Sequence, residues 1–307
     1  MKTATKENNN AGQAASGGAT KFPGWKILMV ALCVGVLTSP VLHAENTHRA
    51  QFIQAQKQYF SAPDSTSLSV TGDLTLEAWI KFSSLPGAQD QFICGKYEIF
   101  PDPPALNRSY ALWFDGSKMQ FRANKTGSSN ENDYAGLWDF SPVLGQWYHV
   151  ALSFSAAAHT ATLYVNGNSF GTVDIPTRTS IFDGDAPFQI GNLYRDYSYL
   201  NRAFDGSIDE VRVWAVARTQ AQIQATMSTE LAGTETGLRG YWKLNNSLAD
   251  SSGNVNTLSN VNGVTFQTND LPFFTPGITS GLLSHYRFDD NTVNESSGNG
   301  NNGVIHG

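Results

Sequence analysis

One stretch of eleven residues constrains the fold of this chain more than any other. Residues 204–214 read Phe-Asp-Gly-Ser-Ile-Asp-Glu-Val-Arg-Val-Trp. Asp205 and Gly206 form a pair that is typical of a turn. From Ile208 onward apolar residues alternate with polar ones, as expected of a strand with one buried face. The stretch therefore predicts a turn that leads directly into a half-buried strand.

A short helix is predicted to follow this strand. Thr219 is a good N-cap residue, and Gln222 stands three positions later, where its side chain can complete a capping box. Ile223 then supplies an apolar side chain for the buried side of the helix.

Strand-like runs separated by turn signals recur from residue 50 onward, with no long helical period between them. They are residues 51–53, 57–60, 74–82, 111–114, 118–121, 147–154, 161–165 and 188–191. Asp115-Gly116 and Asn166-Gly167 have the composition of hairpin turns. Four tryptophans within strands are expected to lie mostly in the core: Trp79, Trp113, Trp147 and Trp214. The pattern predicts an all-β sandwich.

The order of these features resembles laminin-G-like domains of the concanavalin A-like lectin/glucanase superfamily. Residues 204–214 are similar to their F-x-G-x-I-D-E-V-R-V-W signature, and residues 59–81 are similar to the Y-F-x-x-P…L-T-L-E-A-W-I-K order of their opening. The resemblance covers most of the chain after residue 44. It implies an all-β fold, a two-sheet antiparallel jelly-roll sandwich, with one short helix after the last core strand.

The N-terminal part, residues 1–44, predicts a signal peptide. Four lysines precede an apolar run at residues 27–37, and Leu42-His43-Ala44 offers a cleavage site after a small residue. The run is too short to span a bilayer comfortably. We therefore expect a secreted or cell-surface protein that is not embedded in the membrane after cleavage. An uncleaved anchor remains the alternative.

The C-terminal part contains an internal repeat. Residues 238–254, with Tyr241-Trp242 at their start, are echoed by residues 282–299, with one residue inserted. We therefore divide the chain into a laminin-G-like domain at 45–235, a trailing edge segment at 236–270, a linker at 271–280 and the start of a second, truncated laminin-G-like unit at 281–307. In the alternative interpretation, the tail packs back on the first domain.

The charge of the chain excludes some classes of partner. The formal net charge is −6, and when residues 1–44, with four lysines and one glutamate, are set aside, 16 basic and 25 acidic residues remain. An acidic surface argues against nucleic acid or an anionic membrane as a partner and is compatible with a bound cation.

Hydrolysis of a glycosidic bond needs two carboxylates that face one cleft, in this superfamily usually spaced Glu-x-Asp-x-x-Glu. Glu131 and Asp133 begin such a pattern, but no second glutamate follows. Asp209 and Glu210 are adjacent, so on a regular strand they would point to opposite faces. The sequence therefore predicts that the protein is not an enzyme, and an unusual glycoside hydrolase is the third hypothesis.

Calcium is the cofactor that the sequence suggests. Asp205 and Asp209 carry the hard oxygen ligands that calcium prefers. The resemblance to laminin-G-like and pentraxin-like domains strengthens this expectation, because many of them hold a structural calcium beside this strand. The alternative is that Asp205 caps the turn and Asp209 binds loop amides.

Two loops could supply a ligand site by stacking aromatic rings on sugars and hydrogen-bonding to hydroxyls. The candidate ligand-binding residues are Tyr194, Arg195, Asp196, Tyr197 and Tyr199 of one loop and Asn132, Tyr134 and Trp138 of the other. If the loops share a rim, the chain is a non-catalytic module for adhesion that binds a glycan or an extracellular protein, with calcium as a possible support. The alternative is a purely structural repeat of a larger surface protein.

Overall fold

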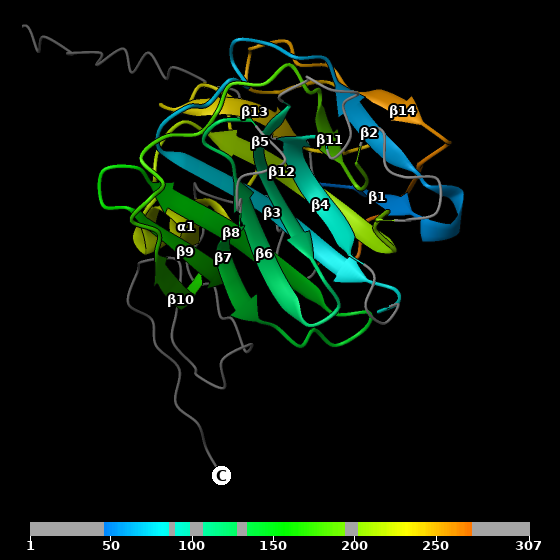
Figure 1. Ribbon diagram of the computed structural model, residues 1–307. Coiled ribbons are helices and arrows are strands. Elements are labelled where there is room, and N and C mark those ends of the chain that lie inside the picture. The colour runs from blue at the N-terminus through cyan, green and yellow to red at the C-terminus, as the bar shows by residue number, and fades with distance from the viewer. Residues whose placement is uncertain (1–45, 86–89, 99–106, 128–133, 194–201, 272–307) are drawn as a thin grey trace, which may run out of the picture. The chain divides into compact units, whose positions relative to one another are not determined.

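The computed structural model describes residues 46–85, 90–98, 107–127, 134–193 and 202–271, with the backbone alone for Tyr134 (Figure 1). Within these residues the chain forms two antiparallel sheets, the helix α1 (Gln220–Thr226) and the 3-10 turn η1 (Gln54–Gln56). The prediction of an all-β, two-sheet jelly-roll sandwich with one short helix is confirmed.

Each strand pairs with its neighbours in one of the two sheets. The eight-stranded sheet has the order β10 (Asn168–Asp174), β9 (Thr160–Val165), β8 (Trp147–Ser155), β3 (Leu74–Phe82), β12 (Gly206–Trp214), β1 (His48–Phe52) and β15 (Thr265–Thr268), and β13 (Leu238–Trp242) also pairs with β12. The seven-stranded sheet has the order β14 (Ser259–Val261), β2 (Tyr59–Ala62), β11 (Phe188–Ile190), β4 (Gln91–Tyr97), β5 (Arg108–Phe114), β6 (Lys118–Ala123) and β7 (Tyr134–Asp139).

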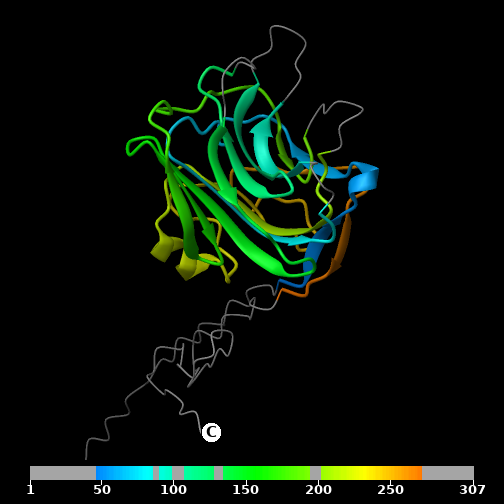
Figure 2. The same ribbon diagram turned by 60° about the horizontal axis from the view of Figure 1, so that its bottom comes forward.

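The two sheets form separate layers around one apolar core (Figure 2). Alternation along β3 shows how the sequence directs residues into this core, because five residues of one face are fully buried in it: Leu74, Leu76, Ala78, Ile80 and Phe82. Across the core Phe82 contacts Phe114 of β5, with ring centroids 5.0 Å apart. The outer faces of both sheets are therefore left for other contacts.

Both predicted hairpin turns are confirmed. The Asp115 carboxylate accepts hydrogen bonds from the backbone N–H groups of Ser117 at 2.9 Å and Lys118 at 2.7 Å, and so closes the turn between β5 and β6. Between β9 and β10, Asn166 and Gly167 have φ angles of 49° and 74°. Asn and Gly tolerate this left-handed conformation, which a two-residue hairpin requires.

Strand β12 contains a β-bulge that the alternating sequence pattern does not show. The register with β3 moves from Asp209 opposite Trp79 to Arg212 opposite Glu77, and Glu210 has a φ of 51°. Because of the extra residue, Asp209 and Arg212 share the outer face, and Glu210 lies beside Arg212 there. The prediction that Asp209 and Glu210 point to opposite faces is wrong for this reason.

Helix α1 covers part of the outer face of the eight-stranded sheet (Figure 2). The predicted capping box is present: the Gln222 N–H donates to Thr219 Oγ1, and the Thr219 N–H donates to Gln222 Oε1 at 2.9 Å. Ile223 is buried, as predicted. The helix is anchored at its end, where Trp79 Nε1 of β3 donates to the Met227 carbonyl at 2.7 Å.

Replacing Thr219 with alanine is expected to lower the free energy of unfolding by about 1 kcal/mol, because one N-terminal N–H of α1 loses its side-chain acceptor. Urea denaturation measures this loss. Thr219→Ser keeps the hydroxyl and should keep most of the stability, so an equal loss in both variants would contradict the capping role.

Residues of the segment 236–270 complete both sheets. Within this segment, β13 pairs with β12, β14 with β2, and β15 with β1. Trp242 of β13 lies in the main core and stacks on Phe188 of β11, with ring centroids 4.9 Å apart. The second copy of the repeat, the proposed signal peptide and the linker beyond Leu271 lie outside the described residues. In the described part of the chain no helix is long and apolar enough to cross a membrane.

Candidate functional site

A row of residues crosses the outer face of the seven-stranded sheet. For Ser61, Gln189, Ala111 and Arg122, both neighbours along the strand belong to the core, as Phe188 and Ile190 do beside Gln189, so alternation turns these four residues outward. Strand register places the members side by side. In order across β2, β11, β4, β5, β6 and β7 they are Ser61, Gln189, Gly95, Ala111, Arg122 and Tyr134. We call this set the outer-face row.

Aromatic rings surround the small residues in the middle of the outer-face row. Phe92 and Tyr97 of β4 and Trp113 of β5 form a second apolar cluster with Ala111 and Leu193. The Trp113 ring centroid lies 6.1 Å from that of Phe92 and 5.7 Å from that of Tyr97. Trp113 is only 2% exposed, so its ring is covered in this structure.

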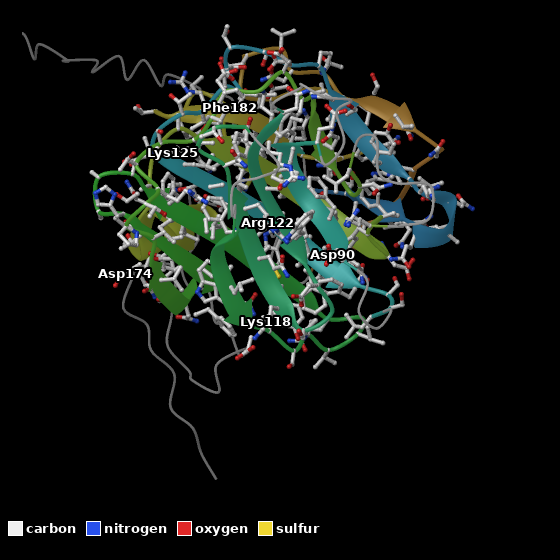
Figure 3. All side chains as sticks on the ribbon, in the orientation of Figure 1. Asp90, Lys118, Arg122, Lys125, Asp174 and Phe182 are labelled. Atoms are coloured by element: carbon white, nitrogen blue, oxygen red, sulfur yellow. The ribbon has the colours of Figure 1, made fainter. Side chains whose placement is uncertain are left out.

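A chain of polar contacts links the rings to the outer-face row. Trp113 Nε1 donates to Gln120 Oε1 at 2.7 Å, and Arg122 Nη2 donates to the same oxygen at 2.9 Å. The Arg122 guanidinium also lies over the Trp113 ring, 4.6 Å from its centroid. Figure 3 shows Arg122 near the middle of this face, with Lys118 below it toward the lower border and Asp90 to its right. A guanidinium, an amide and an indole are thus held together in fixed positions.

Asp115 closes this chain of contacts at the β5–β6 turn, because Gln120 Nε2 donates to its carboxylate. Partial burial acts to raise the pKa of Asp115, but hydrogen bonds from Ser117, Lys118 and Gln120 outweigh burial and lower the pKa. The carboxylate therefore stays ionised and fixes the orientation of Gln120.

Gln189 is one of the five members of the outer-face row that the sequence did not single out as candidates. Its side chain is 0% exposed, and neither its amide nitrogen nor its amide oxygen has a hydrogen-bond partner. Buried amides are nearly always paired, so this one needs an explanation. The alternation of Phe188, Gln189 and Ile190 could have placed it opposite the core. Only the structure shows that it is buried there.

Most of the predicted ligand-binding residues lie outside the described part of the chain. Asn132 and the whole set Tyr194, Arg195, Asp196, Tyr197 and Tyr199 belong to this group, and for Tyr134 only its place in β7 is described.

The remaining candidate, Trp138, points into the main core. It is 6% exposed, and its Nε1 donates to the Gly171 carbonyl of β10 at 3.0 Å. Its ring is therefore not presented to a ligand. The alternation of β7 explains this, because Leu137, one position earlier, takes the exposed side.

The described flanks of the two loops do not share a rim. Strands β4 and β6 both run antiparallel to β5, so they run parallel to each other. Residues 194–201 end at Arg202, whose carbonyl accepts from the Phe92 N–H at the start of β4, at 2.8 Å. Residues 128–133 come after the end of β6. The two loops therefore leave the sheet at opposite ends of its strands.

The two predicted calcium ligands, Asp205 and Asp209, accept hydrogen bonds from different sets of residues. Asp205 accepts hydrogen bonds from the Gln54 N–H at 3.2 Å and from the Ser84 hydroxyl at 2.5 Å. Asp209 is fully buried and accepts from Asn46 Nδ2 and Asn269 Nδ2, each at 2.9 Å. Four residues of extended chain separate the two by about 13 Å, too far for one ion whose ligands lie at about 2.3–2.6 Å.

No group of three or more His, Cys, Asp or Glu residues suited to a metal occurs among the described residues. Asp205 and Asp209 therefore do not fit as ligands of one shared calcium ion. Calcium binding at either residue stays a prediction of the sequence.

Acidic side chains are rare on the seven-stranded sheet. Among its described strand residues, Asp139 at the end of β7 is the single carboxylate. The adjacent pair Asp209 and Glu210 lies on the other sheet and is at most 1% exposed. Neither arrangement offers two carboxylates flanking an open cleft, as glycoside hydrolysis requires.

Comparisons with known proteins agree with this architecture. The family model described as "Concanavalin A-like lectin/glucanases superfamily" matches residues 54–224. A search of curated proteins found no match.

Among solved structures, the chain is similar to a candidate carbohydrate-binding protein from Bacteroides ovatus, with 22% identity and a TM-score of 0.55 over 75% of this chain and 62% of that one. It spans less than two thirds of that protein. It is also similar to a heptameric SAP-like pentraxin from Limulus polyphemus, with 16% identity and a TM-score of 0.47 over 73% of this chain and 96% of that one. At 22% identity the likeness to the Bacteroides ovatus protein shows the fold alone.

Proposed function

This chain belongs to the concanavalin A-like lectin/glucanases superfamily, and from that membership we propose that it is a non-catalytic module that binds carbohydrate. The observation that carries the proposal is the outer face of the seven-stranded sheet. There Trp113, Gln120 and Arg122, each at most 8% exposed, hold an aromatic ring, an amide and a guanidinium at hydrogen-bonding distance from one another. Sugars are recognised by such a combination, because their C–H faces stack on rings and their hydroxyls need donors and acceptors.

A binding role is favoured over hydrolysis by the distribution of carboxylates. Hydrolysis would need a pair of them about 5–10 Å apart across the bound sugar, and in the described strands of this sheet only Asp139 is acidic. The relative from Bacteroides ovatus is itself described as a candidate carbohydrate-binding protein, which supports the same choice. Export, adhesion and calcium dependence stay predictions of the sequence.

Binding of the full chain to a broad glycan array tests the proposal, followed by calorimetry on the best ligand. We expect replacement of Tyr197 and Tyr199 by alanine to weaken binding about two- to tenfold per ring, since one aromatic contact is worth about 0.5–1.5 kcal/mol. Tyr164→Ala is the matched control, because Tyr164 is a half-buried tyrosine of β9 on the other sheet.

Three outcomes of this experiment separate the hypotheses. Loss of binding in the variant without Tyr197 and Tyr199, but not in the control, supports a glycan site that includes these two tyrosines. Equal binding by the loop variant and the control would remove the two tyrosines from the site. If the folded wild-type protein binds no glycan, the carbohydrate proposal fails and a protein ligand or a purely structural role replaces it.

A further inference from the structure

We propose that Arg49, Lys81 and Trp147 form a carboxylate-binding site for an acidic sugar, and that Asp270 of the same chain occupies this site until such a sugar displaces it. The inference goes beyond the function proposed above, because the site lies on the outer face of the eight-stranded sheet and selects its ligand by charge. It starts from a half-exposed carboxylate that side chains of three different strands hold. We call these four residues the Asp270 site.

The strand register holds the three donor side chains together on one face of the sheet. Lys81 of β3 lies opposite Trp147 of β8 on one side and opposite Ser207 of β12 on the other. Arg49 of β1 reaches the same place, because its Nε donates to Ser207 Oγ at 3.1 Å. Their neighbours along the strands belong to the core, so alternation turns the donors outward: Ala50, Ile80, Phe82, Tyr148 and Ile208. The donors therefore belong to the sheet itself and not to a loop.

Asp270 brings its carboxylate onto these donors from the chain that follows β15. One carboxylate oxygen accepts from Trp147 Nε1 at 2.9 Å and lies 3.3 Å from Arg49 Nε, and the other accepts from Lys81 Nζ at 2.5 Å. Partial burial acts to raise the pKa of Asp270, but hydrogen bonds from Lys81 and Trp147 and the charge of Arg49 outweigh burial and lower the pKa. The donors therefore favour an anion at this position.

The Asp270 carboxylate faces solvent and can be exchanged. Its side chain is 55% exposed, whereas those of Arg49 and Lys81 are 14% and 12% exposed. An ion pair with an exposed member contributes little to stability, so the carboxylate leaves its donors at small cost. The backbone stays in place, because the Asn269 N–H donates to the Thr47 carbonyl at 2.8 Å. Only the Asp270 side chain has to turn into solvent.

Unused donors beside Asp270 favour a sugar acid over a simple carboxylate. An ammonium group has three N–H donors, and within the described part of the chain Lys81 Nζ donates to Asp270 alone. Arg49 Nη1 donates to the Thr268 carbonyl at 2.9 Å, and Nη2 has no acceptor among the described residues. A uronic acid carries hydroxyl groups next to its carboxylate, and these can accept from both cations. An acidic side chain of a peptide carries none.

The test is the rescue of Asp270→Ala by glucuronate at constant ionic strength. A ligand that binds only the folded state stabilises it, so glucuronate should raise the thermal unfolding midpoint of this variant as its concentration increases. By calorimetry we expect the variant to bind glucuronate about two- to fivefold more tightly than the wild-type chain, in which Asp270 competes. Glucose lacks the carboxylate and should bind the variant about tenfold or more weakly than glucuronate.

Two further variants serve as controls. Asp139→Ala is the matched control, because Asp139 is an exposed carboxylate that pairs with Lys118 on the other sheet, and its removal changes the net charge equally. It should respond to glucuronate as the wild-type chain does. Adding Lys81→Met to Asp270→Ala removes one donor of the site and should abolish most of the response. The unfolding midpoint of the double variant without glucuronate reports whether its fold is kept.

Three results would overturn the inference. If glucuronate neither binds nor stabilises Asp270→Ala, Asp270 only fastens the end of the described chain to the sheet. If acetate binds as tightly as glucuronate, the site does not recognise a sugar. If a short aspartate-containing peptide binds more tightly than glucuronate, the ligand is a protein. Replacement of Tyr197 and Tyr199 tests the seven-stranded sheet separately, so the failure of one proposal is distinguishable from the failure of the other.

Discussion

Replacing Arg212 with methionine is expected to lower the free energy of unfolding by about 3–5 kcal/mol, the usual cost of removing one partner from a buried ion pair. Arg212 is 1% exposed on the outer face of β12. Its Nη2 donates to Glu210 at 2.7 Å, and its Nη1 lies 3.7 Å from the Glu77 carboxylate. Without the guanidinium, two buried carboxylates would lose a shared positive charge.

The same guanidinium holds the chain that follows α1. Arg212 Nη1 donates to the Thr226 carbonyl at 2.9 Å, and Nη2 donates to the Thr229 carbonyl at 2.7 Å. Methionine can replace the aliphatic part of the side chain but can pair neither carbonyl. The loss should therefore include detachment of the end of the helix from the sheet.

Urea denaturation of Arg212→Met measures the effect. Arg239→Met is the matched control, because Arg239 is exposed on the neighbouring strand β13, and a change there should stay within about 0.5 kcal/mol. Similar small losses in both variants would show that the buried cluster contributes little. A large loss in Arg212→Met alone would identify it as the principal attachment of this part of the chain.

The fold could be predicted from the sequence because its strongest signals are local. Asn166-Gly167 and the Thr219 capping box depend on residues within a few positions of one another, and both form as predicted. Alternation along β3 identifies the core face for the same reason. Such patterns depend only on residues close together in the sequence, so contacts made elsewhere in the chain do not alter them.

The segments that cover the four strand tryptophans could not be predicted in this way. Trp79, Trp113, Trp147 and Trp214 are all buried, but all four lie on outer faces and not in the main core. Trp79 is covered by the chain after α1, and Trp147 Nε1 donates to Asp270 at 2.9 Å. Alternation tells which side of the strand a residue takes, but not which distant segment covers that side.

The candidate site was harder to predict because it depends on register. The outer-face row combines residues that are far apart in the sequence, such as Ser61 and Gln189, which pair directly in the sheet. A shift of one residue in the register of any strand would turn that strand's member toward the core. The sequence directed attention to aromatic loops, and Trp138 instead fills the core beside β10. A single glutamine between two core residues carries no comparable signal.

The pH dependence of stability should change when Glu210 becomes glutamine. Burial raises the pKa of Glu210 to about 7, although Arg212 and the Tyr241 hydroxyl act in the opposite direction. The ordinary value is 4.5. Between these two pH values the folded protein retains a proton that the unfolded chain has released, so the wild-type protein loses stability as the pH rises through this window.

Over this window the stability of the wild-type protein relative to Glu210→Gln should fall by about 3 kcal/mol, since each pKa unit corresponds to about 1.4 kcal/mol. Glutamine keeps an oxygen that accepts from Arg212 and Tyr241 but cannot ionise. Urea denaturation at several pH values from 4 to 8 gives the free energy of unfolding of each protein as a function of pH. In the difference between the two curves, the contributions of groups that titrate identically in both proteins cancel.

Two neighbours make the comparison between the proteins informative. Burial lowers the pKa of His149, which removes stability below its ordinary value of 6.5 and so opposes Glu210 in the wild-type curve. Asp209 is buried with a raised pKa, in part because of the charge on Glu210. In Glu210→Gln that repulsion is gone, so the variant should gain stability toward neutral pH. A difference that stays constant from pH 4 to 8 would mean that Glu210 is ionised throughout, held by Arg212 as an ordinary buried ion pair.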